Sequence, residues 1–224
     1  MNMITDEFLK KKYDKLYKKF VKGDFSEVIK ECNKVLKKRK HQLFLNLLSF
    51  AYQKSGKIEK SIDVMKGALA LNPNHPNFLN NMGTCFYMLH KYSEAEKYFK
   101  KGLEIDKKHL HILNNLGNLK RETYKIEESI EYYKKVLSIQ SDAVPSLFNL
   151  VSIYRITNQK VDSKHYCKKI LELNKKLTDA DRQYSLVHEY VKNDPHLIEM
   201  LKKVNDNYLN NFEKIHVYYG IHKA

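Results

Sequence analysis

The stretch FLNNMGTCFYMLHKYSEAEKYFKKGLEI, residues 78–105, decides the fold of this chain. Its apolar residues recur at steps of three and four and form two groups: Leu79, Met82, Phe86 and then Tyr92, Ala95, Phe99, Leu103. That spacing is typical of amphipathic helices, in which one face packs against a neighbour. A short polar turn, His90-Lys91, separates the two groups. The stretch therefore predicts two antiparallel helices joined by a tight turn.

The same pattern recurs outward in both directions with a period of 34 residues. Four apolar series follow it: Leu45, Leu79, Leu113, Leu147; Leu48, Met82, Leu116, Leu150; Leu69, Leu103, Leu137, Leu171; and Leu71, Ile105, Ile139, Leu173. A fixed period of this length indicates stacked copies of one helical unit. Because one unit cannot bury its apolar face alone, neighbouring copies must cover one another. The sequence predicts an all-α solenoid without strands.

Small residues stand where the two helices of a copy approach most closely. Gly83 and Gly117 occupy the expected crossing of the first and second helices, and Ala95 lies opposite on the second helix, with Pro73 at the end of a copy. This combination resembles the tetratricopeptide repeat (TPR) consensus over residues 6–173. The resemblance implies a right-handed superhelix of antiparallel helix pairs that binds protein ligands. Ser49 and Val151 depart from it at the crossing, and Lys120 stands where Tyr52, Phe86 and Tyr154 stand.

The period divides the chain into segments. We expect an atypical N-terminal repeat or cap at 6–41, repeats at 42–75, 76–109, 110–143 and 144–177, capping or connector helices at 178–210, and the first helix of an incomplete repeat at 211–224. In the first copy the first helix is one residue out of phase. Terminal repeats are often atypical in this way.

Two start signals mark the helices that follow the last full repeat. Thr178 with Asp181 predicts a capping box, ahead of a single apolar stripe formed by Ala180, Tyr184, Val187 and Val191. Asp194-Pro195 predicts the start of the next helix. In the final segment Ile215, Tyr218 and Ile221 have no second helix to cover them. We expect self-association through this helix, or cover from the helices at 180–204.

Charge and composition limit the remaining choices. Lys and Arg number 41 against 26 Asp and Glu, a net charge of +15, and residues up to 42 are the most basic part. Lysines supply point charges without base readout, so no specific nucleic-acid binding is expected. AT-rich coding also explains a lysine- and asparagine-rich chain. With three irregularly spaced cysteines, no leader peptide and no apolar stretch long enough to span a membrane, we expect a cytoplasmic protein.

Catalytic signatures are missing from the sequence. It contains no phosphate-binding loop of the GxxxxGK[ST] type, no GxGxxG, no HExxH and no GxSxG. His109 and His111 lack a third metal ligand nearby. The sequence predicts a non-enzymatic chain without metal or cofactor.

Asparagine is the residue type that suggests a binding site. Asn81, Asn115 and Asn149 recur at the 34-residue period on the first helices, off the face that packs on the second helices. A carboxamide can donate to and accept from a peptide unit. The candidate peptide-binding residues are Asn81, Asn115, Asn149, Asn80, Asn114, Asn118, Arg121 and Arg155. The first three resemble the asparagine ladder of O-linked N-acetylglucosamine transferase, and the ladder breaks at Leu47. Consensus usage and coding bias explain the asparagines equally well.

Two other functions stay open. VKNDPHLIEM (191–200) and YYGIHKA (218–224) resemble the connector of bacterial proteins in which a TPR array precedes a sulfotransferase domain. That resemblance implies that the chain recruits substrate for a transferase domain whose PRSGT-type loop is absent here. The basic surface alone suggests binding to nucleic acid or to acidic partners.

Overall fold

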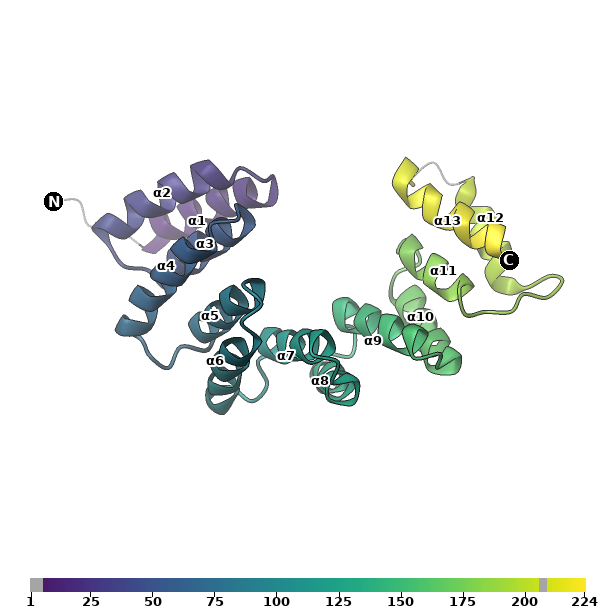
Figure 1. The fold of residues 1–224 in the computed structure, drawn as a ribbon. Coiled ribbons are helices and arrows are strands. Elements are labelled where there is room, and N and C mark those ends of the chain that lie inside the picture. The colour runs from purple at the N-terminus through teal and green to yellow at the C-terminus, as the bar shows by residue number, and fades with distance from the viewer. Residues whose placement is uncertain (1–5, 206–208) are drawn as a thin grey trace. The chain divides into compact units, whose positions relative to one another are not determined.

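The computed structural model describes residues 6–205 and 209–224, and every regular element in these residues is an α-helix (Figure 1). The helices are α1 (Asp6–Val21), α2 (Phe25–Lys38), α3 (Gln42–Lys54), α4 (Ile58–Leu71), α5 (Pro76–Met88), α6 (Tyr92–Ile105), α7 (Leu110–Glu122), α8 (Ile126–Ile139), α9 (Val144–Ile156), α10 (Lys160–Leu173), α11 (Thr178–Ser185), α12 (Pro195–Val204) and α13 (Asn211–Lys223). This confirms the all-α prediction. Among the described residues, no helix has the length and apolarity to cross a membrane.

The helices form two compact units, an N-terminal unit (Met1–Leu119) and a C-terminal unit (Lys120–Ala224). Helix α7 begins in the first unit and ends in the second. Within each unit, consecutive helices pack as hairpins that stack on their neighbours, as Figure 1 shows for α3 to α6. The first and third helices of the N-terminal unit also touch, so first helices of successive repeats line up beside one another.

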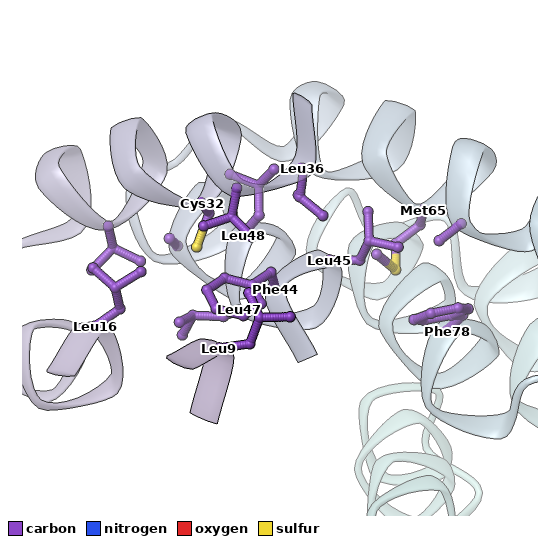
Figure 2. Close-up of a cluster of buried hydrophobic side chains, with 14 of the residues drawn as sticks. Leu9, Leu16, Cys32, Leu36, Phe44, Leu45, Leu47, Leu48, Met65 and Phe78 are labelled. Carbon is purple, nitrogen blue, oxygen red and sulfur yellow. The ribbon is translucent and has the colours of Figure 1, made fainter. Parts of the chain in front are cut away.

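The core of the N-terminal unit follows the predicted apolar pattern. Figure 2 shows these buried side chains between the helices: Leu9, Leu16, Cys32, Leu36, Phe44, Leu45, Leu47, Leu48, Met65 and Phe78. Leu9 and Leu16 anchor α1 to α2 and α3, whereas Tyr17 is 49% exposed. Each fully buried side chain of this size stabilises the fold by about 1.5–3 kcal/mol. The first hairpin is therefore a packed part of the array despite its shifted phase.

The four apolar series divide by burial. Leu45 and Leu48 and their equivalents are at most 8% exposed and form the core between helices. Leu71, Ile105, Ile139 and Leu173 are instead 41–63% exposed, because they occupy the last turn of each second helix, where the chain turns outward. That series marks the period without belonging to the core.

Close approach at the crossing explains both the glycine and its replacement by serine. A Cβ added at Gly83 would lie 2.5 Å from the Phe99 ring, which is 1% exposed. In the preceding repeat Ser49 takes this place, and its Oγ lies 2.7 Å from the Oγ of Ser61. The hydroxyl is thus tolerated because the opposing residue is a small hydrogen-bonding partner.

The turn inside each hairpin has one conformation throughout the array. Gly56, His90, Tyr124 and Asn158 have φ values of 73°, 57°, 58° and 58° and are spaced by 34 residues. Gly23, with φ of 88°, precedes Gly56 by 33 residues. The one-residue shift expected for the first copy is therefore located at its turn. Three of these positions adopt the left-handed region without glycine, which costs about 1–2 kcal/mol each.

Lys120 has a specific partner in the C-terminal unit. It stands in the position that aromatic residues fill in other repeats, and it is 3% exposed. Its Nζ lies 2.7 Å from Glu128 Oε2 on α8. The long aliphatic stem fills the aromatic site while the carboxylate neutralises the ammonium group.

Helix α11 is shorter than the sequence suggested, which corrects two predictions. It ends at Ser185, so Val187 and Val191 lie outside it, and Val191 is 69% exposed. The capping box at Thr178 is also wrong, because the N-cap is Leu177 and no side chain caps the helix. By contrast Asp194 caps α12 as predicted, accepting from the backbone N–H groups of His196 and Leu197.

Helix α13 is covered on one face only. Val217 is fully buried, and Ile221 packs with it against Met200 of α12 and Leu209. A capping box formed by Asn210 and Glu213, which the sequence analysis did not identify, starts the helix. Ile215 and Tyr218 remain 61% and 54% exposed. The helices around 180–204 thus cover part of the predicted face, and self-association stays a prediction.

Candidate functional site

Asparagine side chains of the N-terminal unit form hydrogen bonds between successive first helices. Asn81 Nδ2 of α5 donates to Asn46 Oδ1 of α3 at 2.9 Å. Asn115 Nδ2 of α7 donates to Asn80 Oδ1 of α5, also at 2.9 Å, and lies 3.4 Å from Thr84 Oγ1. Each pair spans 35 residues rather than 34. The pairing therefore joins one residue of a repeat to the neighbour of its equivalent in the next repeat.

This offset explains what sequence periodicity missed. Asn46 is not equivalent to Asn81, so a strict 34-residue comparison ends the series at Leu47, which is 1% exposed in the core. In the structure Asn46 is the first member of the ladder. A search for asparagines 35 residues apart would have found it and its partner.

Burial separates these asparagines into two groups. Asn81 is 1% exposed and Asn80 is 8% exposed, and Asn80 Nδ2 lies 3.4 Å from Asn81 Oδ1. Asn115 is half-buried, and its Oδ1 has no protein donor among the described residues. Asn80 and Asn81 thus hold neighbouring helices together, while Asn115 keeps an acceptor at the surface.

In the C-terminal unit the corresponding contact uses arginine. Arg121 Nη1 donates to Asn149 Oδ1 at 3.1 Å, which joins the end of α7 to α9. Both residues are half-buried, and Arg155, further along α9, is exposed. Asn114 and Asn118 are half-buried on α7. All eight predicted residues thus lie on α5, α7 or α9, with Asn81 the least accessible to a ligand.

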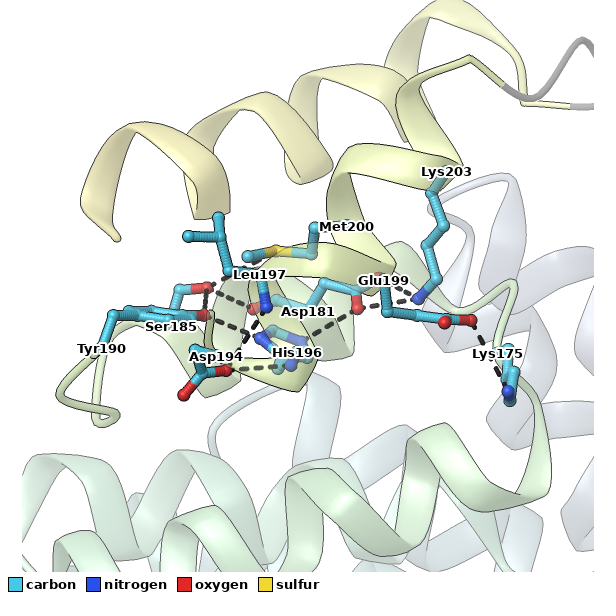
Figure 3. Close-up of polar contacts among 10 residues, drawn as sticks. All are labelled: Lys175, Asp181, Ser185, Tyr190, Asp194, His196, Leu197, Glu199, Met200 and Lys203. Atoms are coloured by element: carbon cyan, nitrogen blue, oxygen red, sulfur yellow. Dashed lines mark hydrogen bonds and ion pairs between the residues drawn. The ribbon is translucent and has the colours of Figure 1, made fainter. Parts of the chain in front are cut away.

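A second polar cluster lies among α11 and α12 (Figure 3). Asp181 is fully buried, and both its carboxylate oxygens lie 2.8 Å from Lys203 Nζ. His196 Nε2 lies 3.1 Å from Asp181 Oδ1, and its Nδ1 lies 2.7 Å from the Tyr190 hydroxyl. The Tyr190 hydroxyl lies 2.6 Å from Ser185 Oγ. Asp181 thus acts as a tertiary anchor between helices, in place of its predicted role in a cap.

Electrostatics and packing favour a structural role for this cluster. Burial raises the pKa of Tyr190 to about 12, and burial also raises that of Tyr184 to about 12, so both rings stay neutral hydrogen-bonding groups. Ser185 is 2% exposed and packed beside α13, where a Cβ at Gly220 would lie 2.9 Å from its Oγ. A substrate could not reach this hydroxyl, so we assign the cluster no nucleophile.

Asp194 combines capping with an ion-pair geometry. Its Oδ2 lies 2.7 Å from His188 Nε2. Burial alone would raise the Asp194 pKa, but the hydrogen bonds from His188 and from the backbone N–H groups of His196 and Leu197 outweigh it. The pKa of this carboxyl therefore lies below its ordinary value, and the carboxylate stabilises the loop before α12.

All three cysteines are buried and unpaired with one another. Burial raises the pKa of Cys32 and of Cys167 to about 12, and it also raises the pKa of Cys85. Thiols in that state are poor nucleophiles and poor metal ligands. Across the described residues, no group of three or more His, Cys, Asp or Glu side chains could hold a metal ion.

Comparison with known proteins follows the repeat period. Two tetratricopeptide-repeat family models match the chain, one over residues 42–108 and the other over residues 109–143. None of the curated protein sequences matches it. Neither repeat match bears on the sulfotransferase connector, which stays a prediction.

Solved structures resemble the chain in fold. A thermophilic TPR protein from Thermus thermophilus, TTC0263, superposes with a TM-score of 0.68 at 14% identity, covering 77% of this chain and 94% of that one. MamA gives 0.57 at 22% identity, covering 71% and 94%. A tetratricopeptide repeat protein from Parabacteroides merdae gives 0.59 at 12% identity, covering 93% and 96%.

Proposed function

Because this chain is a tetratricopeptide-repeat protein, matched as such over residues 42–143 and in its fold, we propose that it binds an extended polypeptide along the first helices of its repeats. The repeats make it a protein–protein interaction module. The finer assignment, to a peptide held by side-chain amides, rests on the asparagine contacts described above. We propose no catalytic step for the chain.

The observation that carries the proposal is the fixed orientation of the amides. Asn115 is held by two hydrogen bonds from its Nδ2, which leaves its Oδ1 to accept from a peptide N–H group. Fixing a side chain before binding reduces the entropy lost on association. Adjacent helices lie about 10 Å apart, so an extended chain at about 3.3 Å per residue would meet a new helix every third residue.

The candidate residues take different roles in this proposal. Asn115, Asn149 and the exposed Arg155 contact the ligand, and Arg155 favours an acidic group within it. Asn81 supports the ladder from beneath, since a 1% exposed amide cannot reach a ligand without displacing its partner Asn46.

A binding selection followed by titration tests this function. Random twelve-residue peptides displayed on phage would be selected on the immobilised chain, and a selected peptide titrated against Asn115→Ala with Asn149→Ala. Two lost amide contacts should weaken binding by about 5- to 150-fold. Asn74→Ala, an exposed asparagine in the loop before α5, is the control and should leave affinity unchanged. Equal affinity of the folded double variant and the control would contradict the proposal.

A further inference from the structure

Helices α1 and α2 carry a surface that lies apart from the asparagine ladder. A cleft of about 450 Å³ runs between them, and a second cleft of about 370 Å³ lies alongside. Phe8 and Lys12 line both clefts, so the two meet at Phe8. The Phe8 ring is 54% exposed there, above the buried side chains of Leu16 and Val35. An apolar floor thus lies open to solvent at the N-terminal end of the array.

The walls of the two clefts are strongly basic. Seven lysines line them against two glutamates: Lys11, Lys12, Lys15, Lys19, Lys34, Lys37 and Lys38 against Glu27 and Glu31. Both glutamates are already paired, and Glu31 lies 2.6 Å from Lys34 and 3.0 Å from Lys12. Those hydrogen bonds, from Lys34 first and then Lys12, hold the pKa of the Glu31 carboxyl at about 2. Lys15, Lys37 and Lys38 are exposed and form no salt bridge among the described residues.

We propose that this surface is a second docking site, which takes an acidic polypeptide segment carrying an aromatic or aliphatic residue. The apolar residue would cover Phe8 while flanking carboxylates meet the exposed lysines. This site is separate from the peptide face of the proposed function, and neither depends on the other. Complementary charge would set the association rate and the salt dependence of binding.

The mixture of an apolar floor with fixed negative charges favours a peptide over nucleic acid. A flexible peptide can place its carboxylates beside the exposed lysines and avoid Glu27 and Glu31. A phosphate backbone carries a charge on every nucleotide and would meet both glutamates. The basic residues lining the clefts are also all lysines, whereas planar recognition of phosphates and bases favours arginine.

Charge-matched variants of the full chain test the site. The probe is a fluorescent twelve-residue peptide of glutamates interrupted by phenylalanine and leucine, titrated at physiological salt. Substituting Lys15, Lys37 and Lys38 with Gln should weaken binding by about 3- to 100-fold. The control substitutes Lys60, Lys97 and Lys101, exposed lysines of α4 and α6, and removes the same total charge. Those charges lie outside the clefts, and screening should keep their effect under about twofold.

Further arms identify the chemistry of the occupant. Phe8→Ser should weaken the probe by about tenfold, and a probe with serine in place of its apolar residues should lose affinity on the unchanged chain to a similar extent. The Asn115→Ala, Asn149→Ala variant should bind the probe normally, which separates this site from the proposed function. Three results would overturn the inference: equal losses in the two lysine variants, oligothymidylate binding more tightly than the peptide, or phosphatidylserine vesicles doing so.

Discussion

Two glycine-to-alanine substitutions in neighbouring repeats should change stability in opposite directions. Gly67 lies inside α4, and a Cβ added there meets nothing within 4 Å. Gly83 lies inside α5, where the same Cβ would be 2.5 Å and 2.6 Å from two atoms of the Phe99 ring. Both residues belong to the N-terminal unit, so both variants report on the same packed core.

The magnitudes follow from helix propensity and packing. Alanine in place of glycine inside a helix stabilises by about 0.5–1 kcal/mol, and Gly67→Ala should gain that amount. Gly83→Ala has the same gain, but a methyl group forced into a filled core costs about 1–3 kcal/mol. Phe99 is 1% exposed and has no open space into which its ring could move. The two variants should therefore differ by about 1–3 kcal/mol, with Gly83→Ala the less stable.

Urea unfolding followed by far-ultraviolet circular dichroism measures the difference. The denaturation midpoint should rise for Gly67→Ala and fall for Gly83→Ala, with similar slopes. Phe99→Leu, which shortens the opposing side chain, should cost less in the Gly83→Ala background than in the unchanged chain. If both alanine variants moved the midpoint upward by the same amount, the close crossing would not constrain this repeat.

Three other measurements check separate features of the structure. Cys167, whose pKa burial raises to about 12, should resist a thiol reagent near neutral pH until urea unfolds the chain, and rapid labelling of the folded state would contradict its burial. Glu128→Gln leaves the ammonium of Lys120 buried beside a neutral group and should cost about 1–2 kcal/mol, discounted because Glu128 is 48% exposed, while the exposed neighbour Glu127→Gln should stay within about 0.5 kcal/mol. The pKa of Asp194 is lower in the folded chain than in the unfolded one, so its carboxylate stabilises above the unfolded pKa, and that stability is lost as pH falls through the folded pKa; Asp194→Asn should therefore lower the urea midpoint at neutral pH and have a shrinking effect in acid.

The fold was predictable because each copy states the same local pattern. Apolar steps of three and four fix the helices, and small residues such as Gly83 and Ser61 mark where helices approach. The left-handed turns were harder to foresee, since Tyr124 has no intrinsic preference for a φ of 58°. The packing of the surrounding hairpin imposes that conformation, and no neighbouring residue in the sequence announces it.

Contacts between repeats were less predictable than contacts within them. Periodicity placed Asn81 and Asn115 on one face, but it could not show that each pairs with the residue before its equivalent. The end of the array was the least predictable part. Thr178 and Asp181 have the spacing of a cap, yet Asp181 bonds to Lys203, 22 residues away. Local capping and a distant ion pair compete for the same carboxylate, and the buried pair prevails here.

The 35-residue offset of the asparagine ladder has a consequence for the growth of such arrays. Asn81 and Asn115 are equivalent residues, and each donates to an asparagine of the preceding repeat. Excision of residues 76–109 would bring Asn115 to the place that Asn81 now holds, opposite Asn46. The hydrogen bond between repeats would re-form with the same atoms. Duplication of the segment would likewise add one more rung, so unequal recombination can lengthen or shorten this ladder by whole repeats without leaving a buried amide unmatched.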